Sequence, residues 1–183
     1  RRVHGALDPK GAGLPGMPSG GGKERCRLPA EMNMEYAIVD AAASPQIANV
    51  LGGYATSGIA WPLFEHQPEA SSADVGPWLI QLNGDGWVRR WLLNLEARPG
   101  RVCWVTSDEP VGAVIEHLQA RLEVRLSDGG LALFRFWDGR ALYRVWTVMT
   151  REQKRAFMAP FLRWSVWLQG QQWQLDRDVV EKS

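Results

Sequence analysis

The sequence predicts an α/β fold, in which a mixed sheet with flanking helices forms a single domain. Strand-like runs alternate with helical patterns of about ten to fifteen residues, and 183 residues is the length of one domain that can bury a core. A hairpin-like segment at 123–137 adds antiparallel pairing, and the patterns after residue 139 leave room for a small helical lobe at the C-terminal end.

The expected elements of the N-terminal half begin with a strand and a helix. They are a strand at 36–40, a helix at 44–55, two short strands separated by an exposed proline-rich loop, the second at 77–82, a helix at 86–97 and a strand at 101–107. Ser44 is typical of an N-cap and Pro45 of a first helical position. Trp87 and Trp91 fall on the apolar stripe of the second helix, and Trp104 lies in an apolar strand, so packing explains these three indoles.

The C-terminal half is expected to hold three helices and two strand pairs. They are a helix at 107–122, the hairpin at 123–137 around the turn 127–130, a helix at 139–149, a helix from 151 to about 160 and a terminal strand pair at 163–175. Ser107 and the acidic residues after it favour a helix start. Thr150 and Gln153 stand three apart, the spacing of a capping box in which each side chain satisfies a backbone donor of the other residue.

Both ends of the chain differ from the domain at 34–176. Residues 1–33 hold Gly and Pro clusters without the apolar stretch of a secretory signal, which predicts a flexible leader. The chain opens with Arg, while Met32 and Met34 stand just before the first strand, so a start at either Met with translated upstream sequence before it is an equal alternative. Residues 177–183 are expected to be a polar tail.

Charge and composition argue against several classes of function. Residues 1–33 carry six basic and three acidic side chains, which leaves the rest of the chain with a net charge of −2. A nucleic-acid binder is expected to show a basic face, so this class loses weight. No apolar run approaches the roughly 20 residues that span a bilayer, and neither cysteine belongs to a paired metal-ligand motif. We therefore expect no nucleic acid, membrane, metal or cofactor, and a cytoplasmic location.

No catalytic constellation can be assembled from the sequence. A Gly-x-Ser-x-Gly elbow is absent, and capping explains Ser107 beside Asp108 far better than catalysis does. His66 next to Glu65 lies in a proline-rich loop, without the burial that tunes a catalytic pKa, and His117 lies on the flank of a helix. The chain is expected not to be an enzyme, and a small hydrolase using His66 or His117 is the third-ranked alternative.

A dense aromatic and cationic segment, FRFWDGRALYRVW, occupies residues 134–146. Its first residues are expected to form a strand, in which side chains point alternately to the two faces. Phe134 and Phe136 then enter the core, while Arg135 and Trp137 point to the other face.

The turn after this strand leads into a helix. Asp138 is expected to cap the helix, with Arg135 and Arg140 on either side to pair with its carboxylate. The corner therefore has a structural explanation, and whether the two arginines also contact a partner stays open.

Tryptophan is the compositional outlier, with ten copies. Six lie in strands, in turns or beside prolines: Trp61, Trp78, Trp137, Trp164, Trp167 and Trp173. Burial is the better explanation for any one of them, but a domain of this size cannot hide every indole, so the set predicts at least one accessible cluster. Exposed tryptophan near arginine is typical of protein-protein hot spots.

Several blocks of the chain together resemble one family. In order, they are YAIVDAA at the start of the domain, WPLF at 61–64, GPWLIQL at 76–82, SDEPVGAVIEHLQARLEV at 107–124, FRFWDGRAL at 134–142 and TREQKRAFMAP at 150–160. This order and spacing over about residues 34–175 resembles the type VI secretion effector-chaperone family, the Tap or Tec adaptors, whose members long carried only a domain-of-unknown-function label. The ordered set is much more specific than any single block.

This resemblance implies a non-catalytic adaptor chaperone that binds one cognate effector and promotes its loading onto the VgrG spike protein. The partner-binding candidates are Trp61, Phe64, Trp78, Trp137, Arg140, Trp164 and Trp167, and the structural motif is Arg135, Asp138 and Gly139. An immunity protein that neutralises a neighbouring toxin is the second-ranked alternative, since it would also be small and non-catalytic.

One position departs from the family pattern. Gly139 stands where the family usually has proline. Glycine lacks the preset φ of proline at the first helical position, so the corner is expected to be looser in this chain.

Overall fold

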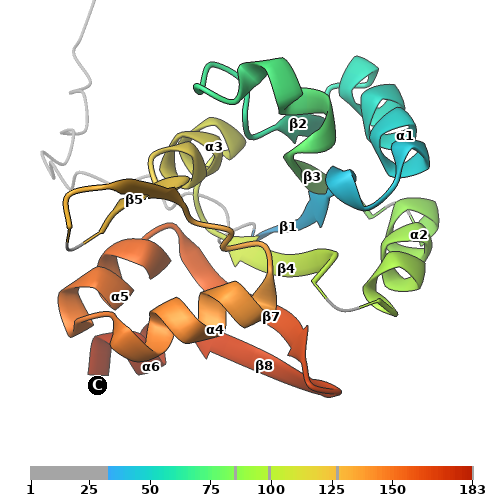
Figure 1. The fold of residues 1–183 in the computed structure, drawn as a ribbon. Coiled ribbons are helices and arrows are strands. Elements are labelled where there is room, and N and C mark those ends of the chain that lie inside the picture. The colour runs from blue at the N-terminus through green and yellow to red at the C-terminus, as the bar shows by residue number, and fades with distance from the viewer. Residues whose placement is uncertain (1–32, 85, 99, 127, 183) are drawn as a thin grey trace, which may run out of the picture. The chain divides into compact units, whose positions relative to one another are not determined.

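The centre of the fold is a six-stranded sheet with the order β2-β3-β1-β4-β7-β8 (Figure 1). The computed structural model describes residues 33–84, 86–98, 100–126 and 128–182, so the predicted leader lies outside them except for Asn33. The strands of this sheet are β1 (Met34–Asp40), β2 (Ala60–Pro62), β3 (Pro77–Leu82), β4 (Val102–Ser107), β7 (Phe161–Leu168) and β8 (Gln171–Asp176). A separate two-stranded hairpin is formed by β5 (Glu123–Arg125) and β6 (Leu131–Leu133).

The described strand pairings are antiparallel throughout. The α/β class is confirmed, but the parallel component that alternating strands and helices favour is not found in this part of the chain. The reason is the strand order, because strands joined by a single helix are not neighbours. β3 lies between β1 and β2, and β1 lies between β3 and β4. The two strands that a helix connects are therefore separated by a third strand, which runs antiparallel to both.

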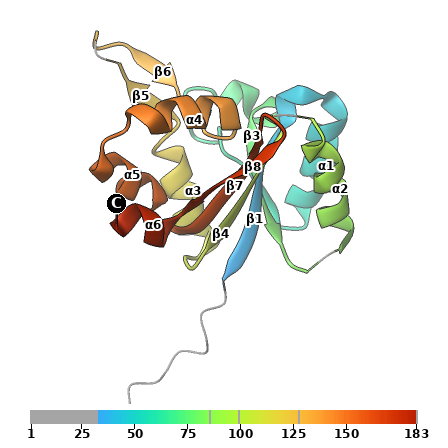
Figure 2. The same ribbon diagram turned by 90° about the horizontal axis from the view of Figure 1, so that it is seen from below.

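Helices lie on both faces of the sheet (Figure 2). One face carries α1 (Pro45–Thr56) and α2 (Gly86–Glu96), and the other carries α3 (Val111–Gln119), α4 (Gly139–Val148), α5 (Arg151–Met158) and α6 (Arg177–Lys182). Two 3-10 helices, η1 (Ala41–Ala43) and η2 (Ala70–Val75), lie in the connections. None of the described helices has the length and apolar character that crossing a bilayer requires.

The alternation of side chains along the strands gives the sheet a separate core on each face. The larger core lies under α3 to α6 and contains a contiguous group of rings, Phe136, Phe157, Phe161 and Trp164. The smaller core lies under α1 and α2, whose inward residues are Ile47, Leu51, Val88 and Leu92. Both cores consist almost entirely of apolar residues, so their burial holds the layers together.

The predicted helix starts are largely confirmed. The Ser44 hydroxyl accepts a hydrogen bond from the Gln46 backbone N–H, with proline at the first helical position. Thr150 and Gln153 form the predicted capping box at the start of α5. Ser107 is the exception, because α3 begins four residues later, and the buried Ser107 hydroxyl donates to the Pro160 carbonyl oxygen.

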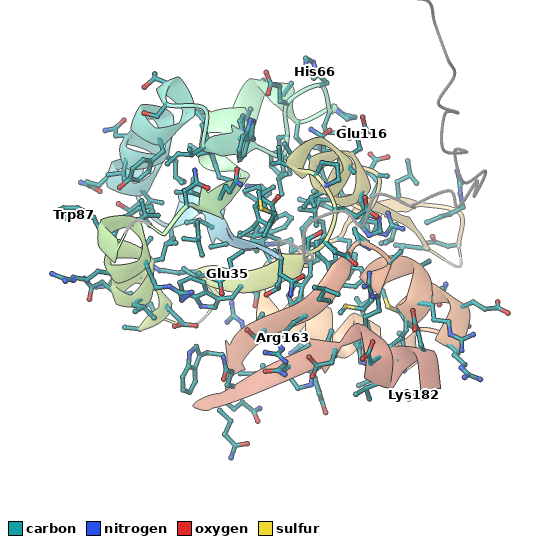
Figure 3. All side chains as sticks on the ribbon, turned by 180° about the vertical axis from the view of Figure 1, so that it is seen from behind. Glu35, His66, Trp87, Glu116, Arg163 and Lys182 are labelled. Carbon is teal, nitrogen blue, oxygen red and sulfur yellow. The ribbon has the colours of Figure 1, made fainter. Side chains whose placement is uncertain are left out.

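Trp87 is placed differently from the prediction. Its side chain is 73% exposed, and Figure 3 shows it on the outer side of α2. Val88 and Leu92 define the inward stripe of α2, and Trp91 and Trp104 are only partly buried beside it. The apolar pattern of the sequence includes Trp87. In the structure, α2 is oriented so that Val88 and Leu92 face the sheet and Trp87 faces outward.

The C-terminal residues form helix α6 and not only a polar tail. Val180 is buried in the larger core, and the Arg177 guanidinium pairs with the Asp108 carboxylate at 2.7 Å. Arg151 and Arg155 of α5 also donate to the Glu181 carbonyl oxygen. Burial of Val180 and these arginine contacts hold α6 against the rest of the domain.

Replacing Val180 with Ala is expected to lower the free energy of unfolding by about 1–2 kcal/mol, because two buried methyl groups are lost. Val148→Ala on α4 is the matched control, since Val148 is 79% exposed and should change stability by less than about 0.5 kcal/mol. Urea unfolding of both variants tests this. Equal stabilities of the two variants would contradict the docking of α6.

Candidate functional site

The segment Phe134–Gly139 is a tight corner and not the end of a strand. β6 ends at Leu133, and the backbone then turns, with the Phe136 N–H donating to the Phe134 carbonyl and the Asp138 N–H to the Arg135 carbonyl. Phe134 and Phe136 are buried as predicted. Trp137 is also buried, which corrects the expectation that it points to the other face, because strand alternation does not apply inside a turn.

Asp138 caps α4, as predicted, and Arg140 clamps the cap. One carboxylate oxygen accepts from the Arg140 backbone N–H and Nε at 3.0 Å each, and the other accepts from Arg140 Nη2 at 2.8 Å. Burial alone would raise the pKa of Asp138, but these hydrogen bonds and the charges of Arg140 and Arg135 outweigh it and leave that pKa below its ordinary value. The Arg140 guanidinium is therefore paired within the chain, with the Asp138 carboxylate.

Gly139 lies directly against β7. A Cβ atom built at this position would be 2.7 Å from Val166 Cγ2, closer than real Cβ contacts allow, and 3.2 Å from Val166 Cβ, which is tight. Proline carries a Cβ as well, so the family residue would require the Val166 side chain to shift here. Glycine at this position permits a close approach of α4 to the sheet, and the looser corner expected from the missing proline stays a prediction.

Two further contacts tie the corner to the sheet. The Cys103 thiol of β4 donates to the Trp137 carbonyl oxygen at 2.8 Å. The Arg135 guanidinium reaches back to Asp40 at 3.2 Å and lies 5.9 Å from the centre of the Trp137 ring. These contacts assign Arg135 a positioning role at the junction of β1 and the corner.

The structure divides the seven predicted partner-binding residues. Four are buried in the two cores and offer no side-chain surface to a partner: Phe64, Trp78, Trp137 and Trp164. Trp61 is half-buried against the larger core. Trp167 and Arg140 are exposed, but Arg140 is clamped to Asp138. Trp167 is therefore the member of the set that can act as a free hydrophobic anchor.

Trp167 lies beside a groove between α2 and the strands β4, β7 and β8, here called the α2–β7 groove. Helices α1 and α2 cover only β1 to β4 on their face, so the β7 and β8 part of the sheet stays open (Figure 2). The groove has a volume of about 470 Å³ and is lined by Trp104, Thr106, Ser165, Trp167, Gln172 and Gln174 from the sheet and by Arg89, Leu93 and Glu96 from α2. Trp167 is 42% exposed and Leu93 is 51% exposed.

A second hollow of about 420 Å³ continues the groove at the β7–β8 turn. Leu93, Glu96 and Trp167 line both hollows, so the aliphatic and the aromatic residue form a shared ridge. An accessible indole beside an accessible leucine, with polar residues around them, is the composition of a protein-binding surface.

Charged contacts surround the α2 wall of this groove. Arg89 pairs with Glu35 of β1 at 2.6 Å and lies 5.5 Å above the Trp104 ring. The Trp104 indole N–H donates to the Glu96 carboxylate at 2.7 Å. Figure 3 shows Glu35 and Arg163 on the same side of the sheet, where Arg163 pairs with Asp176 of β8 at 2.9 Å. Charged and polar side chains thus accompany Leu93 and Trp167, the two hydrophobic anchors of the groove.

Sequence reasoning missed two exposed apolar groups. Leu131 and Leu133 of β6 lie exposed on one side of the hairpin, and Leu126 lies exposed beyond β5. The spacing of Leu131 and Leu133 by two residues indicates one face of a strand. Their exposure follows from the hairpin being a separate two-stranded sheet, which the sequence pattern does not show.

The residues considered for catalysis lie apart in different surroundings. His66 is exposed in a loop with φ of 63°, while the His117 ring donates to the Phe157 carbonyl at 2.9 Å. Burial lowers the pKa of His117 to about 4, against the opposing effect of the Phe157 carbonyl, and so keeps the ring neutral. Burial also raises the pKa of the Cys103 thiol. Within the described residues, His, Cys, Asp and Glu do not gather into a group that could hold a metal ion.

Comparison with known proteins gives one match. The model of the family described as Domain of unknown function (DUF4123) matches residues 35–156, from β1 to α5. No curated protein and no solved structure matches the chain. The matched region includes the corner and the α2 wall, while β7 and β8 follow it.

Gly139→Ala is expected to destabilise the chain by about 1–3 kcal/mol, because its methyl group collides with Val166. Gly112→Ala in the first turn of α3 is the control, since the space around Gly112 is open and alanine should stabilise by about 0.4–1 kcal/mol. In a Val166→Ala background the cost at position 139 should shrink. Equal costs in both backgrounds, measured by urea unfolding, would disprove the collision.

Stability is expected to fall as pH decreases from about 6.5 toward 4. In this window the unfolded chain protonates His117 while the folded chain, with a pKa of about 4, does not, so protonation favours unfolding. His117→Gln should flatten this part of the curve, and His66→Gln in the exposed loop should not. Thermal melts of the three proteins at steps between pH 7 and 4 measure the difference; parallel curves would reject the role of His117.

Proposed function

The chain belongs to the DUF4123 family, and from this premise we propose that it is an adaptor chaperone of type VI secretion, which binds a cognate effector and promotes its loading onto the VgrG spike. The ordered blocks that resemble the Tap or Tec adaptors fall within or next to the matched region. In this proposal the chain acts in the cytoplasm by binding and not by catalysis.

The observation that carries the proposal is the α2–β7 groove. A sheet face left half open, with Trp167 and Leu93 accessible at its side, supports binding of another protein. The polar pairs around these anchors match the mixed character of a surface that is exposed before the partner arrives. Arg140, by contrast, supports the fold of the corner.

The first test is co-expression of the chain with each product of its flanking genes, followed by tag pull-down and size-exclusion chromatography. A stable complex with a large effector that still forms after deletion of the effector's toxic domain is the expected result. Binding to the toxic domain alone would favour an immunity protein, and no complex with any of these products would contradict the proposal.

Trp167→Ala is expected to weaken effector binding about 10- to 30-fold, because truncating an exposed aromatic anchor removes a hot spot. Trp87→Ala is the matched control: Trp87 is more exposed but lies outside the lining of the groove. Titration calorimetry on the purified pair measures both affinities. If the two variants bind equally well, the α2–β7 groove is not the binding surface.

A further inference from the structure

The two edges of the six-stranded sheet differ in protection. At one edge, β2 is three residues long and ends in Pro62, which has no backbone N–H to offer. At the other edge, β8 is six residues long and contains no proline, lysine or arginine. Proteins usually shorten, charge or cover an edge strand to prevent pairing. β8 carries none of these sequence devices within Gln171–Leu175.

The turn before β8 sets which backbone groups point outward. Gln169 and Gly170 have φ of 53° and 78°, so they form the two-residue loop of a type I′ hairpin closed by the pair Leu168 and Gln171. Hydrogen-bonded and non-hydrogen-bonded pairs alternate from there. The N–H and C=O groups of Gln172 and Gln174 therefore point away from β7. Within the described chain, the backbone of 171–175 makes no hydrogen bond outside the β7 ladder.

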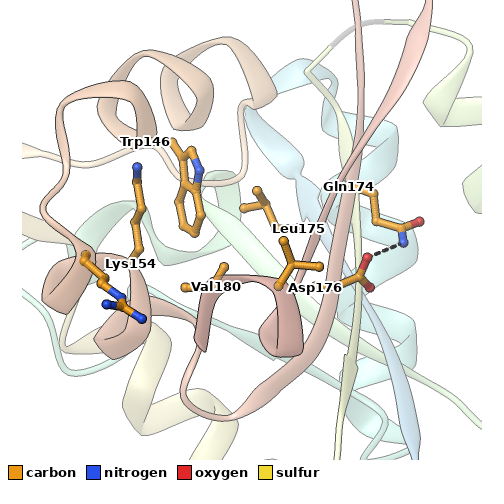
Figure 4. Close-up of a pocket in the computed structure, with 8 residues that line it drawn as sticks. Trp146, Lys154, Gln174, Leu175, Asp176 and Val180 are labelled. Carbon is orange, nitrogen blue, oxygen red and sulfur yellow. Dashed lines mark hydrogen bonds between the residues drawn. The ribbon is translucent and has the colours of Figure 1, made fainter. Parts of the chain in front are cut away.

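A pocket of about 310 Å³ lies along this edge (Figure 4). Gln174, Leu175 and Asp176 all line it, together with Trp146 of α4, Arg151 and Lys154 of α5, and two residues of α6. Consecutive strand residues point to opposite faces, so a pocket lined by three in a row lies beside the backbone and not on a face. A segment paired with β8 would pass over this pocket.

The pocket has unneutralised positive charge. Asp176 is already occupied, since it accepts from Arg163 at 2.9 Å and from Gln174 at 2.8 Å. The Lys154 ammonium lies 5.5 Å above the Trp146 ring and pairs with no carboxylate among the described residues. The Arg151 guanidinium donates to a backbone carbonyl, which leaves its charge uncompensated. The site favours an anionic side chain.

We propose that an extended, acidic segment of the effector pairs with β8 as an added strand, with an Asp or Glu side chain beside Trp146 and Lys154. Strand addition uses backbone hydrogen bonds for affinity and side-chain pockets for specificity. This inference rests on the proposed function, because it names the part of the effector that is bound.

Charge argues against two other occupants. The chain's own residues 1–33 carry a net charge of +3 and are rich in Gly and Pro, which suits neither a cationic pocket nor a strand. A second copy would bring its own β8, whose carboxylate at Asp176 is already paired with Arg163. An acidic segment of a different protein fits the pocket better than either.

The backbone test compares two substitutions at Gln174. Gln174→Pro removes the outward N–H and is expected to weaken effector binding about tenfold. One hydrogen bond to the added strand is lost, and the proline ring also hinders the approach of that strand. Gln174→Ala loses the same side chain but keeps the N–H, so it should bind more tightly than Gln174→Pro, and the difference between the two variants measures the outward N–H. Both are assayed by calorimetry with the effector identified by co-expression, after circular dichroism and melting confirm that each variant is folded.

The charge test reverses one lysine in the pocket. Lys154→Glu is expected to weaken binding about tenfold and to reduce its salt dependence. Lys182→Glu near the end of α6 is the control with the same charge change, and it should have little effect because Lys182 does not line the pocket. Hydrogen exchange adds a direct readout: the amides of Gln172 and Gln174 should become protected in the complex.

The outcomes separate this inference from the proposed function. If the effector binds but each variant matches its control and the two amides stay unprotected, the edge is not used and the adaptor function stands. If no flanking-gene product binds, the proposed function itself fails. A wild-type dimer that Gln174→Pro dissociates would assign the edge to a second copy. Faster exchange at Gln174 after deletion of residues 1–32 would assign it to the chain's own N-terminal segment. Either result would overturn the proposal.

Discussion

The position of helix α4 depends on one close approach, between Gly139 and Val166 of β7. The helix start is held from the other sides by the Asp138 cap and by the Cys103 thiol of β4. With the first residue of α4 held there, burial of Leu142 keeps the next turns over the sheet. Tyr143 and Trp146 then meet the ring of Trp173 on β8 at 5.4 and 6.3 Å. The wall of the edge pocket is thus a consequence of the corner.

The α2–β7 groove depends in the same way on where α2 is anchored. Burial of Val88 and Leu92 contributes about 1.5–3 kcal/mol for each side chain. The exposed Arg89 and Glu35 pair contributes at most about 1 kcal/mol. The apolar residues therefore decide the position of the helix, and the charged residues decide the chemistry of the groove. Substitutions at Arg89 can change what the groove binds without moving its wall.

The sequence predicts correctly those features that depend on residues close together in the chain, such as helix caps. The capping box at Thr150 and the cap at Asp138 need only three or four residues to form, so they were predictable. Burial of Phe134 and Phe136 also followed from spacing. Trp137 was placed wrongly because the strand ends at Leu133, and Trp164 because its surroundings come from distant segments. The edge position of β8 follows from a strand order that no local pattern encodes.

Strand β8 connects the α2–β7 groove with the pocket at the sheet edge. The side chains of Gln172 and Gln174 line the α2–β7 groove, while the outward backbone of the same residues forms the free edge. A strand added at about 4.8 Å from β8 would extend the floor of the groove, and its side chains would alternate between the two faces. An acidic residue would then enter the pocket beside Lys154, and the residues next to it in the segment would lie at the rim of the groove beside Gln172 and Gln174. One segment with a period of two can therefore satisfy both surfaces, which a helix with a period of 3.6 cannot do.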